Sequence, residues 1–398
     1  MNLIRVVVSL NIIFLYLIGK SSNIRWCNKN ISLAMFLGIP TALSSLSSRF
    51  SILNKTVLTT NFAVVASLVL CFAFAINLRF ICGNKRINAS NSNLIILMLL
   101  SGYAVINGIL LQQSWLAPLG IFLIQFNALR WSISSKEFFS AVLGALFANL
   151  FLLFFATFSP GALEQCRLDK CLVFKNVFSG LVGGNGLGID LYVFYCTLLY
   201  TSKISNRSRF LFYIISLLML STTSSRTGII SFIFCIVCYE LNYFFTKRIY
   251  INALMLSVLF YSSYPLWGTY TEKAFTERGY LWLYAKSLIH DVGFVGYGTS
   301  FWTRLGESKG FVSNYGIHNL WLDVLIALGF LGLSLFICVL AFFYLNNNST
   351  LYKTLVVSLI FSGMTESTFI LWKLYPISIV FIVLSVVTTS EKSVKLRN

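Results

Sequence analysis

The chain has 398 residues, of which 57% are hydrophobic and only 11% are charged, and its formal net charge is +18. An ordinary soluble domain carries about a quarter charged residues, so this composition excludes that class. Apolar runs of about 20 residues recur along the whole length, each long enough to cross a bilayer core. They are continuous rather than alternating, which excludes a membrane β-barrel and predicts an all-α, polytopic membrane helical bundle.

The basic residues gather in short segments between the apolar runs, such as Lys203–Arg209, and in the tail from Lys392 to Arg397. This is the positive-inside pattern, so we expect anionic membrane lipids, and not nucleic acid, to be the partners of these charges. The first apolar run, Val6–Ile18, follows Arg5 and has no small-residue cleavage site after it. A retained first helix is therefore expected.

Thirteen apolar segments in chain order are predicted as membrane spans. They cover residues 4–19, 31–47, 57–82, 94–111, 115–130, 137–158, 177–201, 209–223, 227–246, 249–267, 318–345, 354–371 and 375–389. The weakest are the second, which is rich in Ser and contains Pro40, and the fifth; a re-entrant segment or a merger there is left open. No repeat or linker divides the chain, so residues 1–398 are predicted to form a single integral membrane domain.

The basic segments orient these spans. When the spans are counted through the second half, one side receives Arg130–Lys136, Lys203–Arg209, Lys247–Ile251 and the tail, and it is predicted to be cytoplasmic. The opposite, periplasmic side receives Pro160–Lys175, Ser221–Arg226, Gly268–Ile317 and Glu366–Lys373. The amino-terminal third fits less well, because thirteen spans put the amino terminus outside as well.

The Gly268–Ile317 loop is the only long polar interval in the second half. At about 50 residues it is longer than a plain connector, and loops of that length often have a function. Its middle, Phe275–Ile289, mixes aromatic and aliphatic residues with charges, which predicts a helix lying in the membrane interface. Gly293, Gly296 and Gly298 follow, and they predict a flexible or tightly turned backbone. Their spacing is a weak nucleotide-loop signal, because no strand precedes them and no Gly-Lys-Ser/Thr follows.

The cysteines are mostly inside apolar runs. Cys235 and Cys238 have the spacing of a metal pair but lie in mid-helix without further ligands, so packing is the favoured role. Cys166 and Cys171 flank a polar segment of a predicted periplasmic loop. A disulfide between them is a hypothesis, and two free thiols are the alternative.

Two arginines on the predicted outer side are candidates for an anion site. Arg226 lies in Ser224-Ser225-Arg226-Thr227-Gly228 between two apolar runs, and Arg278 lies in the predicted loop helix. A guanidinium group offers a fork of donors that matches phosphate oxygens. Two simpler readings stay open: Arg226 snorkels from a helix end, and Arg278 is a surface charge.

His318 and Asn319 stand where the long loop meets the next apolar run, and His318 is one of only two histidines. A polar group at the start of a membrane helix sits in the wet head-group region. An imidazole titrates near neutral pH, so His318 is a candidate base, with a structural histidine as the alternative. His290 is a weaker candidate, because it precedes Asp291 and is expected to cap the loop helix.

Glu366 is a lone carboxylate at a late corner of the chain. Such groups default to a functional hypothesis with a partner, here Arg226, Arg278 or Lys373. A catalytic metal site is not expected, because it needs several His or carboxylate ligands together and the outer face supplies few.

An ordered set of motifs resembles the O-antigen ligase and polymerase superfamily of bacterial inner membranes. The motifs are Ser225-Arg226-Thr227-Gly228, Arg278-Gly279 with Trp282 and Gly296-Tyr297-Gly298, and His318-Asn319 with Leu322 and Gly329-Phe330-Leu331-Gly332-Leu333. They span about Arg226 to Leu333, and the hydropathy resemblance covers the whole chain. No single motif is specific; the order and spacing are moderately so.

The resemblance implies a bundle of about twelve helices with one large periplasmic loop, and a thirteenth span departs from it. It implies a glycosyltransferase that uses an undecaprenyl-diphosphate-linked glycan without a metal, a cofactor or a nucleotide sugar. Arg226 and Arg278 would hold the diphosphate, and His318 would orient or deprotonate the acceptor hydroxyl. Asn319 and Glu366 are further substrate-binding candidates. The implied partners are the lipid-linked oligosaccharide, a glycan acceptor and membrane lipids, and a chain-length regulator protein is left open.

A polymerase transfers the glycan to another lipid-linked repeat unit, whereas a ligase transfers it to lipid A–core. The polymerase is favoured, because the loop has no strongly basic patch for a heavily phosphorylated core. A lipid-linked glycan flippase or other transporter is the alternative from another class. It should carry charge at mid-membrane depth, whereas the charges here gather at helix ends.

Overall fold

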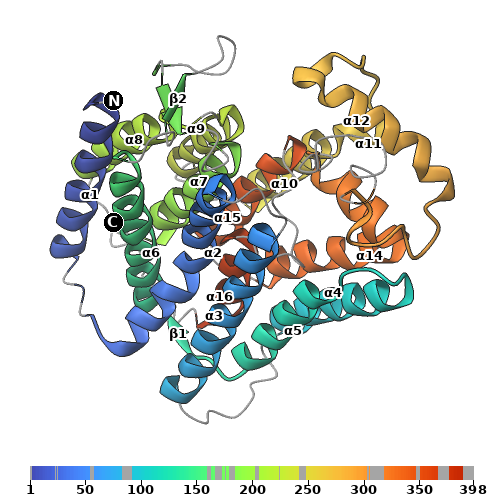
Figure 1. The fold of residues 1–398 in the computed structure, drawn as a ribbon, viewed down its shortest axis with the longest axis horizontal. Coiled ribbons are helices and arrows are strands. Elements are labelled where there is room, and N and C mark those ends of the chain that lie inside the picture. The colour runs from blue at the N-terminus through green and yellow to red at the C-terminus, as the bar shows by residue number, and fades with distance from the viewer. Residues whose placement is uncertain are drawn as a thin grey trace.

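The computed structural model describes residues 2–22, 24, 26–53, 58–82, 92–158, 163–165, 173–174, 176–178, 184–201, 206–223, 225–241, 248–302, 304, 318–346, 350–365 and 376–388. Figure 1 shows a helical bundle, as predicted. Its first half contains α1 (Asn2–Ser21), α2 (Asn28–Leu53), α3 (Leu58–Cys82), α4 (Ser92–Leu110), α5 (Leu116–Ala128), α6 (Ser135–Ala156) and α7 (Gly184–Thr201). Its second half contains α8 (Asn206–Ser221), α9 (Arg226–Leu241), α10 (Arg248–Ser262), α11 (Tyr264–Trp267), α12 (Ala274–Leu288), α14 (Leu320–Leu345), α15 (Thr350–Phe361) and α16 (Pro376–Val386). Two short 3-10 helices are η1 (Ile289–Asp291) and η2 (Ser362–Met364).

Each of the thirteen predicted spans overlaps a described helix, including the weak second and fifth segments, which overlap α2 and α5. Within the described residues, five helices are long and apolar enough to cross a membrane by length and composition: α1, α3, α4, α6 and α14. Six further apolar helices in the described residues, such as α5 and α16, have 10–17 residues and are shorter than a simple span. The helical membrane class is thus confirmed, and the number of spans stays a prediction.

Two pairs of short strands accompany the helices, and the pair β1–β4 joins distant parts of the chain. β1 (Ile133–Ser134) pairs in parallel with β4 (Val387–Thr388), and β2 (Leu163–Gln165) pairs antiparallel with β3 (Asn176–Phe178). Figure 1 shows these two pairs at opposite ends of the bundle. The predicted span 177–201 was therefore too long at its start: β3 takes its first residues, and the helix begins only at Gly184.

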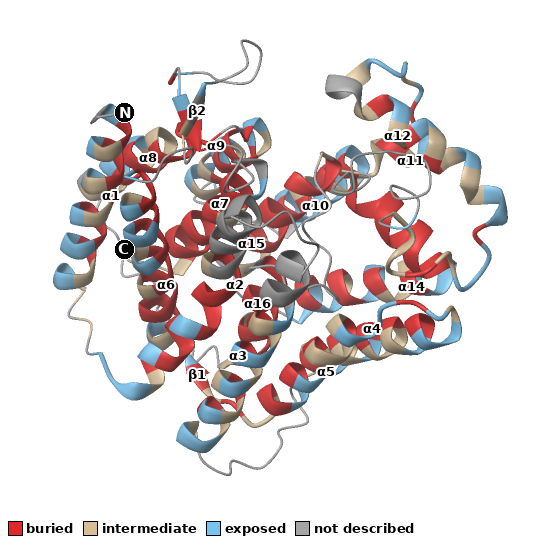
Figure 2. Ribbon diagram, viewed as in Figure 1, coloured by how far each residue is buried: buried red, intermediate tan, exposed pale blue. Residues whose placement is uncertain are grey.

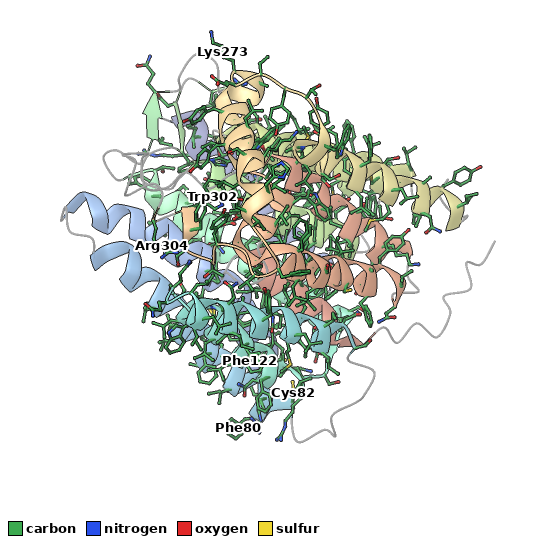
Figure 3. The ribbon with its side chains drawn as sticks, turned by 90° about the vertical axis from the view of Figure 1, so that its right-hand side faces the viewer. Phe80, Cys82, Phe122, Lys273, Trp302 and Arg304 are labelled. Atoms are coloured by element: carbon green, nitrogen blue, oxygen red, sulfur yellow. The ribbon has the colours of Figure 1, made fainter. Side chains whose placement is uncertain are left out.

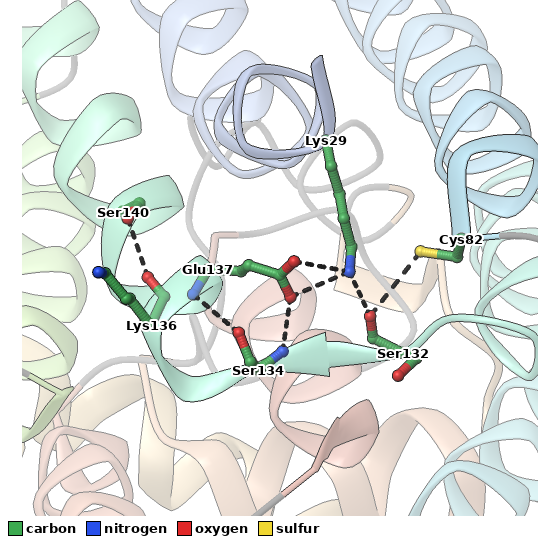
Figure 4. Close-up of polar contacts among 7 residues, drawn as sticks. All are labelled: Lys29, Cys82, Ser132, Ser134, Lys136, Glu137 and Ser140. Atoms are coloured by element: carbon green, nitrogen blue, oxygen red, sulfur yellow. Dashed lines mark hydrogen bonds and ion pairs between the residues drawn. The ribbon is translucent and has the colours of Figure 1, made fainter. Parts of the chain in front are cut away.

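At the end of the bundle that holds β1, hydrogen bonds connect the first turn of α6 to the start of α2. Ser134 and Glu137 form a capping box, and Lys29 Nζ binds both Glu137 carboxylate oxygens at 2.8 and 2.9 Å (Figure 4). Lys29 Nζ also donates to the Ser132 carbonyl at 2.6 Å, so the start of α2 is tied to the start of α6. An anionic residue in the first turn suits the helix dipole as well as the lysine.

The amino terminus lies at the other end. Arg5 donates to the Thr157 hydroxyl and carbonyl, both at 3.1 Å, and its guanidinium stacks on Phe158 just after α6 ends. Thirteen spans predict that the amino terminus lies on the same side as the long loop. The Arg5 contact agrees with this prediction, because α6 starts at the end of the bundle that holds Lys29 and finishes at the end that holds Arg5. Figure 3 shows the same polarity, with Lys273 at one extreme of the molecule and Phe80 and Cys82 near the other.

Burial follows the bundle interior (Figure 2). Large apolar side chains stay exposed on outer surfaces, for example Phe80 at 78% and Leu256 at 67%, as expected for helices that face lipid. Small residues permit the closest approaches: a Cβ on Gly188 would clash with Ser225, so the starts of α7 and α9 touch. This contact fixes where the first turn of α9, and with it Arg226, can lie.

One long helix is broken in the middle. Gly329 of α14 has φ 67° and ψ −169°, so the element consists of two helical halves. The 293–300 loop fills the break: Tyr297 N donates to Ile326 O and Gly298 N donates to Ala327 O, each at 2.8 Å. The predicted tight turning of this glycine segment is confirmed, since Gly293, Gly296 and Gly298 all have positive φ.

Side chains from α4 and from the turn after it bind both the 293–300 loop and the broken part of α14. Tyr103 Oη donates to Leu328 O at 3.0 Å and Asn107 Nδ2 donates to Val295 O at 2.6 Å. The Gln113 side chain donates to Tyr297 O and accepts from Ser300 N. Ile326 O, Ala327 O and Leu328 O, three carbonyl groups beside the break, thus accept hydrogen bonds from outside their helix, as low-dielectric surroundings require.

Candidate active site

The turn after α15 connects the residues that the sequence singled out. Phe361 leads into η2, and the chain then reaches Thr365. Carbonyl groups of this turn accept hydrogen bonds from α12 and from the start of α14, and its threonine hydroxyl contacts the first turn of α9. Three helices that are far apart in the sequence thus meet at one short segment.

Arg226 is the first residue of α9. Ser225 precedes it, and the Ser225 hydroxyl accepts from Gly228 N at 3.1 Å, which begins the helix with a side-chain cap. The Arg226 side chain is exposed and makes no hydrogen bond or ion pair with another residue that the structure describes. Its guanidinium donors are therefore free to bind an anion at the start of a helix, where the dipole also favours negative charge.

Arg278 is half-buried on α12, and its Nη1 donates to the Thr365 carbonyl. The next residue, Gly279, is buried, and a Cβ there would collide with the Thr271 carbonyl. The glycine thus lets α12 fold back onto the preceding turn, where Tyr280 N donates to Glu272 O at 3.0 Å. This contact aims the arginine at the turn instead of at bulk solvent.

A pair of threonines links the two arginines. Thr227 Oγ1 and Thr365 Oγ1 lie 3.0 Å apart, next to Arg226 on one side and beside the carbonyl bound by Arg278 on the other. Neither threonine was a candidate from the sequence. The only signal was their position, one directly after Arg226 and the other directly before Glu366.

Asn319 ties the start of α14 to the same turn. Its Oδ1 accepts from Leu322 N at 2.9 Å, so it is the N-cap of α14. Its Nδ2 lies within hydrogen-bond distance of the carbonyls of Ser262, Gly363 and Met364, at 3.1, 3.2 and 3.0 Å. The side chain is fully buried, so the amide is already satisfied by the protein.

His318 immediately precedes this cap. The helix begins at Leu320, two residues later than predicted, and His318 has a positive φ of 52° and a partly exposed side chain. A positive φ is uncommon for a residue other than glycine and calls for a tertiary reason. The hydrogen bonds of Asn319 supply this reason, because they hold the residue after His318 against three carbonyl groups.

Aromatic residues at the start of the long loop pack against α12. Tyr270 packs edge-on against the buried Trp282 at 5.4 Å and donates to Pro265 O at 2.8 Å. Burial raises the pKa of Tyr270, so it stays a neutral donor. Lys286 Nζ donates to Gly268 O at 2.9 Å and lies over the Tyr270 ring. The predicted helix is confirmed as α12, one residue earlier than the predicted Phe275–Ile289 at both ends, and its place in the membrane interface stays a prediction.

Some predicted residues lie outside the described part of the chain. These are Glu366, Lys373, Cys166, Cys171, residues 305–317 of the long loop and the tail from Lys392. His290 is described and lies exposed in η1, apart from the turn after α15. Within the described residues, no group of three or more His, Cys, Asp or Glu is arranged to hold a metal ion.

A comparison with known protein families bears on this arrangement. Residues 211–337, roughly a third of the chain, match the family described as O-antigen ligase. The match supports the resemblance of this region to the O-antigen ligase and polymerase superfamily. Arg226, Arg278 and His318 all fall inside the matched region, whereas Thr365 falls outside it. No curated protein matches the chain.

Proposed function

We propose that the chain is an O-antigen polymerase of the bacterial inner membrane. It would transfer an undecaprenyl-diphosphate-linked glycan onto another lipid-linked repeat unit at the periplasmic face. The superfamily match supports ligase-like or polymerase-like function in general. The observation that carries the proposal further is the turn after α15, which contacts Arg278, the neighbour of Arg226 and the neighbour of His318.

The two arginines have complementary roles in this proposal. Arg278 is held beside the turn by its Nη1 contact with Thr365 O, and in this proposal its guanidinium group binds one phosphate group. Arg226 is exposed and offers its whole fork to the other phosphate group. As the bond between the anomeric carbon and the diphosphate oxygen breaks, negative charge grows on the leaving oxygen. Fixed guanidinium groups stabilise that charge without a metal or a cofactor.

His318 completes the reaction. The acceptor hydroxyl attacks the anomeric carbon, and its proton passes to the imidazole as the new glycosidic bond forms. Undecaprenyl diphosphate leaves as an anion and needs no proton from an acid. Asn319 acts as a positioning residue, because its amide already makes hydrogen bonds with backbone groups and thereby holds the segment that carries His318. Glu366 follows Thr365 directly and remains a proposed substrate-binding residue.

The polymerase is preferred to the ligase on charge. Positive and negative charges nearly balance in residues 268–304, which carry Lys273, Arg278, Lys286 and Arg304 against Glu272, Glu277 and Asp291. This balance does not favour binding of a heavily phosphorylated lipid A–core. The ligase remains the second candidate because the family description names that activity. A chain-length regulator would be a partner of the polymerase alone.

Deletion of the gene followed by a lipopolysaccharide gel separates these functions. Core carrying a single repeat unit supports the polymerase. Bare core with lipid-linked polymer accumulating identifies a ligase instead. Absence of both products on the periplasmic side would indicate a flippase and would overturn the proposed transfer chemistry.

A further inference from the structure

A second polar position lies on α7, away from the arginines. Asp190 is about two turns into this helix and stays partly exposed, although its neighbours Leu187, Gly188 and Ile189 are buried. No ion pair or hydrogen bond of ordinary geometry joins Asp190 to another described residue. A carboxyl group inside a membrane bundle is costly unless something binds it, so Asp190 needs a partner from elsewhere.

Thr41 on α2 faces the same carboxyl group. It lies close enough to act on the Asp190 carboxyl, although the geometry falls short of a hydrogen bond. The Thr41 side chain is only 1% exposed, and its Oγ1 has no hydrogen-bond partner among the described residues. A helical threonine normally donates to the carbonyl four residues back. Thr197 and Thr201 of α7 do so at 2.7 Å, which makes the unsatisfied hydroxyl of Thr41 exceptional.

Open space adjoins these two side chains. Gly186 lies one turn before Asp190 on the same face of α7, it is exposed, and a Cβ there would meet no atom within 4 Å. Two residues before Asp190, Gly188 touches Ser225 and Gly228 at the start of α9. Asp190 therefore lies only about 3 Å deeper along α7 than the level of Arg226, on the other face of the helix.

We propose that Asp190 and Thr41 form a subsite for hydroxyl groups of the sugar that the lipid diphosphate carries. This inference rests on the proposed function, which puts the diphosphate at Arg226. A carboxyl group binds sugar hydroxyls through hydrogen bonds in either protonation state, and a threonine hydroxyl both donates and accepts. The pair thus complements a neutral polyol, whose hydroxyl groups also donate and accept. The arginines bind the charged part of the donor and the subsite binds its sugar.

The test compares two probes on purified protein in lipid nanodiscs: undecaprenyl diphosphate, and the same lipid bearing one N-acetylhexosamine. Wild-type protein should bind the sugar-bearing lipid more tightly. Asp190→Asn should weaken that binding about tenfold, the scale of about one lost hydrogen bond, and leave the sugar-free lipid unchanged. Thr41→Val should act in the same direction to a smaller extent.

Thr197→Val is the matched control, because Thr197 lies two turns deeper on the same face of α7 but is satisfied by its own helix. It should change neither affinity. The subsite is refuted if wild-type protein binds both lipids equally, if Asp190→Asn retains full preference for the sugar, or if it weakens both lipids equally. Binding of neither lipid by wild-type protein would refute the proposed function together with the subsite.

Discussion

Arg226 and Arg278 differ in how their guanidinium groups are held, and this difference shapes what each substitution should do. The Arg278 guanidinium group donates to the Thr365 carbonyl, whereas the Arg226 side chain is exposed and makes no hydrogen bond to a described residue. A lysine ammonium has three donors but lacks the planar fork of a guanidinium group, so it cannot bind two phosphate oxygens in the same bidentate geometry. Charge alone is therefore not expected to be sufficient at either position.

We predict that Arg226→Lys and Arg278→Lys each lower the transfer rate by about 100-fold, with alanine no better than lysine. The measurement is glycan transfer by purified protein, with immunoblots to confirm that the variants accumulate normally. Arg304→Lys is the control, since Arg304 is another exposed arginine of the loop region. Near-normal rates in both lysine variants would mean that the two arginines only snorkel.

At His318 the prediction separates a base from a positioner. His318→Ala should abolish or severely reduce transfer while the lipid-linked donor still binds, because the hydroxyl must lose its proton in the reaction. His290→Ala should be close to neutral, since His290 lies exposed in η1, apart from the turn after α15. If the imidazole only positions the acceptor, His318→Gln should keep substantial activity. The pH–rate profiles of the wild type and of this variant should then have the same shape.

At the element scale, α14 depends on the loop that fills its break. Gly329 has a φ and ψ combination that other residues essentially cannot adopt, and a Cβ there would collide with the Phe294 carbonyl. Gly293 also has positive φ, but a Cβ there would meet nothing within 4 Å. The two glycines therefore differ in packing and share backbone handedness.

We predict that Gly329→Asn lowers the thermal midpoint in detergent strongly and removes most transfer activity, because the loop can no longer dock and the half-helix after His318 shifts. Gly293→Asn should be tolerated at a cost of about 1 kcal/mol, since Asn enters the left-handed region most readily. Equal stability of the two variants would show that the docking of the loop into α14 is dispensable.

The helices themselves were predictable because each apolar run is long, and hydropathy needs no tertiary information. The break in α14 was not, because Gly329 sits in a continuous apolar run and its backbone is set by a loop more than 30 residues earlier in the chain. Likewise β3 reads as apolar helix from composition, since Val177 and Phe178 continue the run and only pairing with β2 reveals a strand.

The candidate site was predictable as a set of residue types on one face. Their convergence was not, because it depends on Thr227 and Thr365, which are 138 residues apart and individually unremarkable. Asn319 was chosen for its possible contact with substrate, whereas the structure commits its amide to a cap and three carbonyls. Sequence patterns identify chemistry more readily than they reveal which group is already satisfied.

Across the whole molecule, the contact of Arg5 with Thr157 places the amino terminus at the end of the bundle where α9 and α14 begin. We predict that reporters fused after Gly306 and after Asn398 give opposite signals, periplasmic and cytoplasmic respectively. An Asn2→Cys variant should react with a membrane-impermeant thiol reagent added from the periplasm. Matching reporter signals, or an amino terminus protected from that reagent, would contradict this orientation.

The most direct measurement of the central claim is transfer by the purified protein alone, reconstituted with an undecaprenyl-diphosphate-linked repeat unit as donor and acceptor and with a metal chelator present. The account predicts glycans of two or more units, release of undecaprenyl diphosphate in equal amount, and loss of both products in Arg278→Lys and His318→Ala. Elongation that requires added metal, or that persists in both variants, would contradict it.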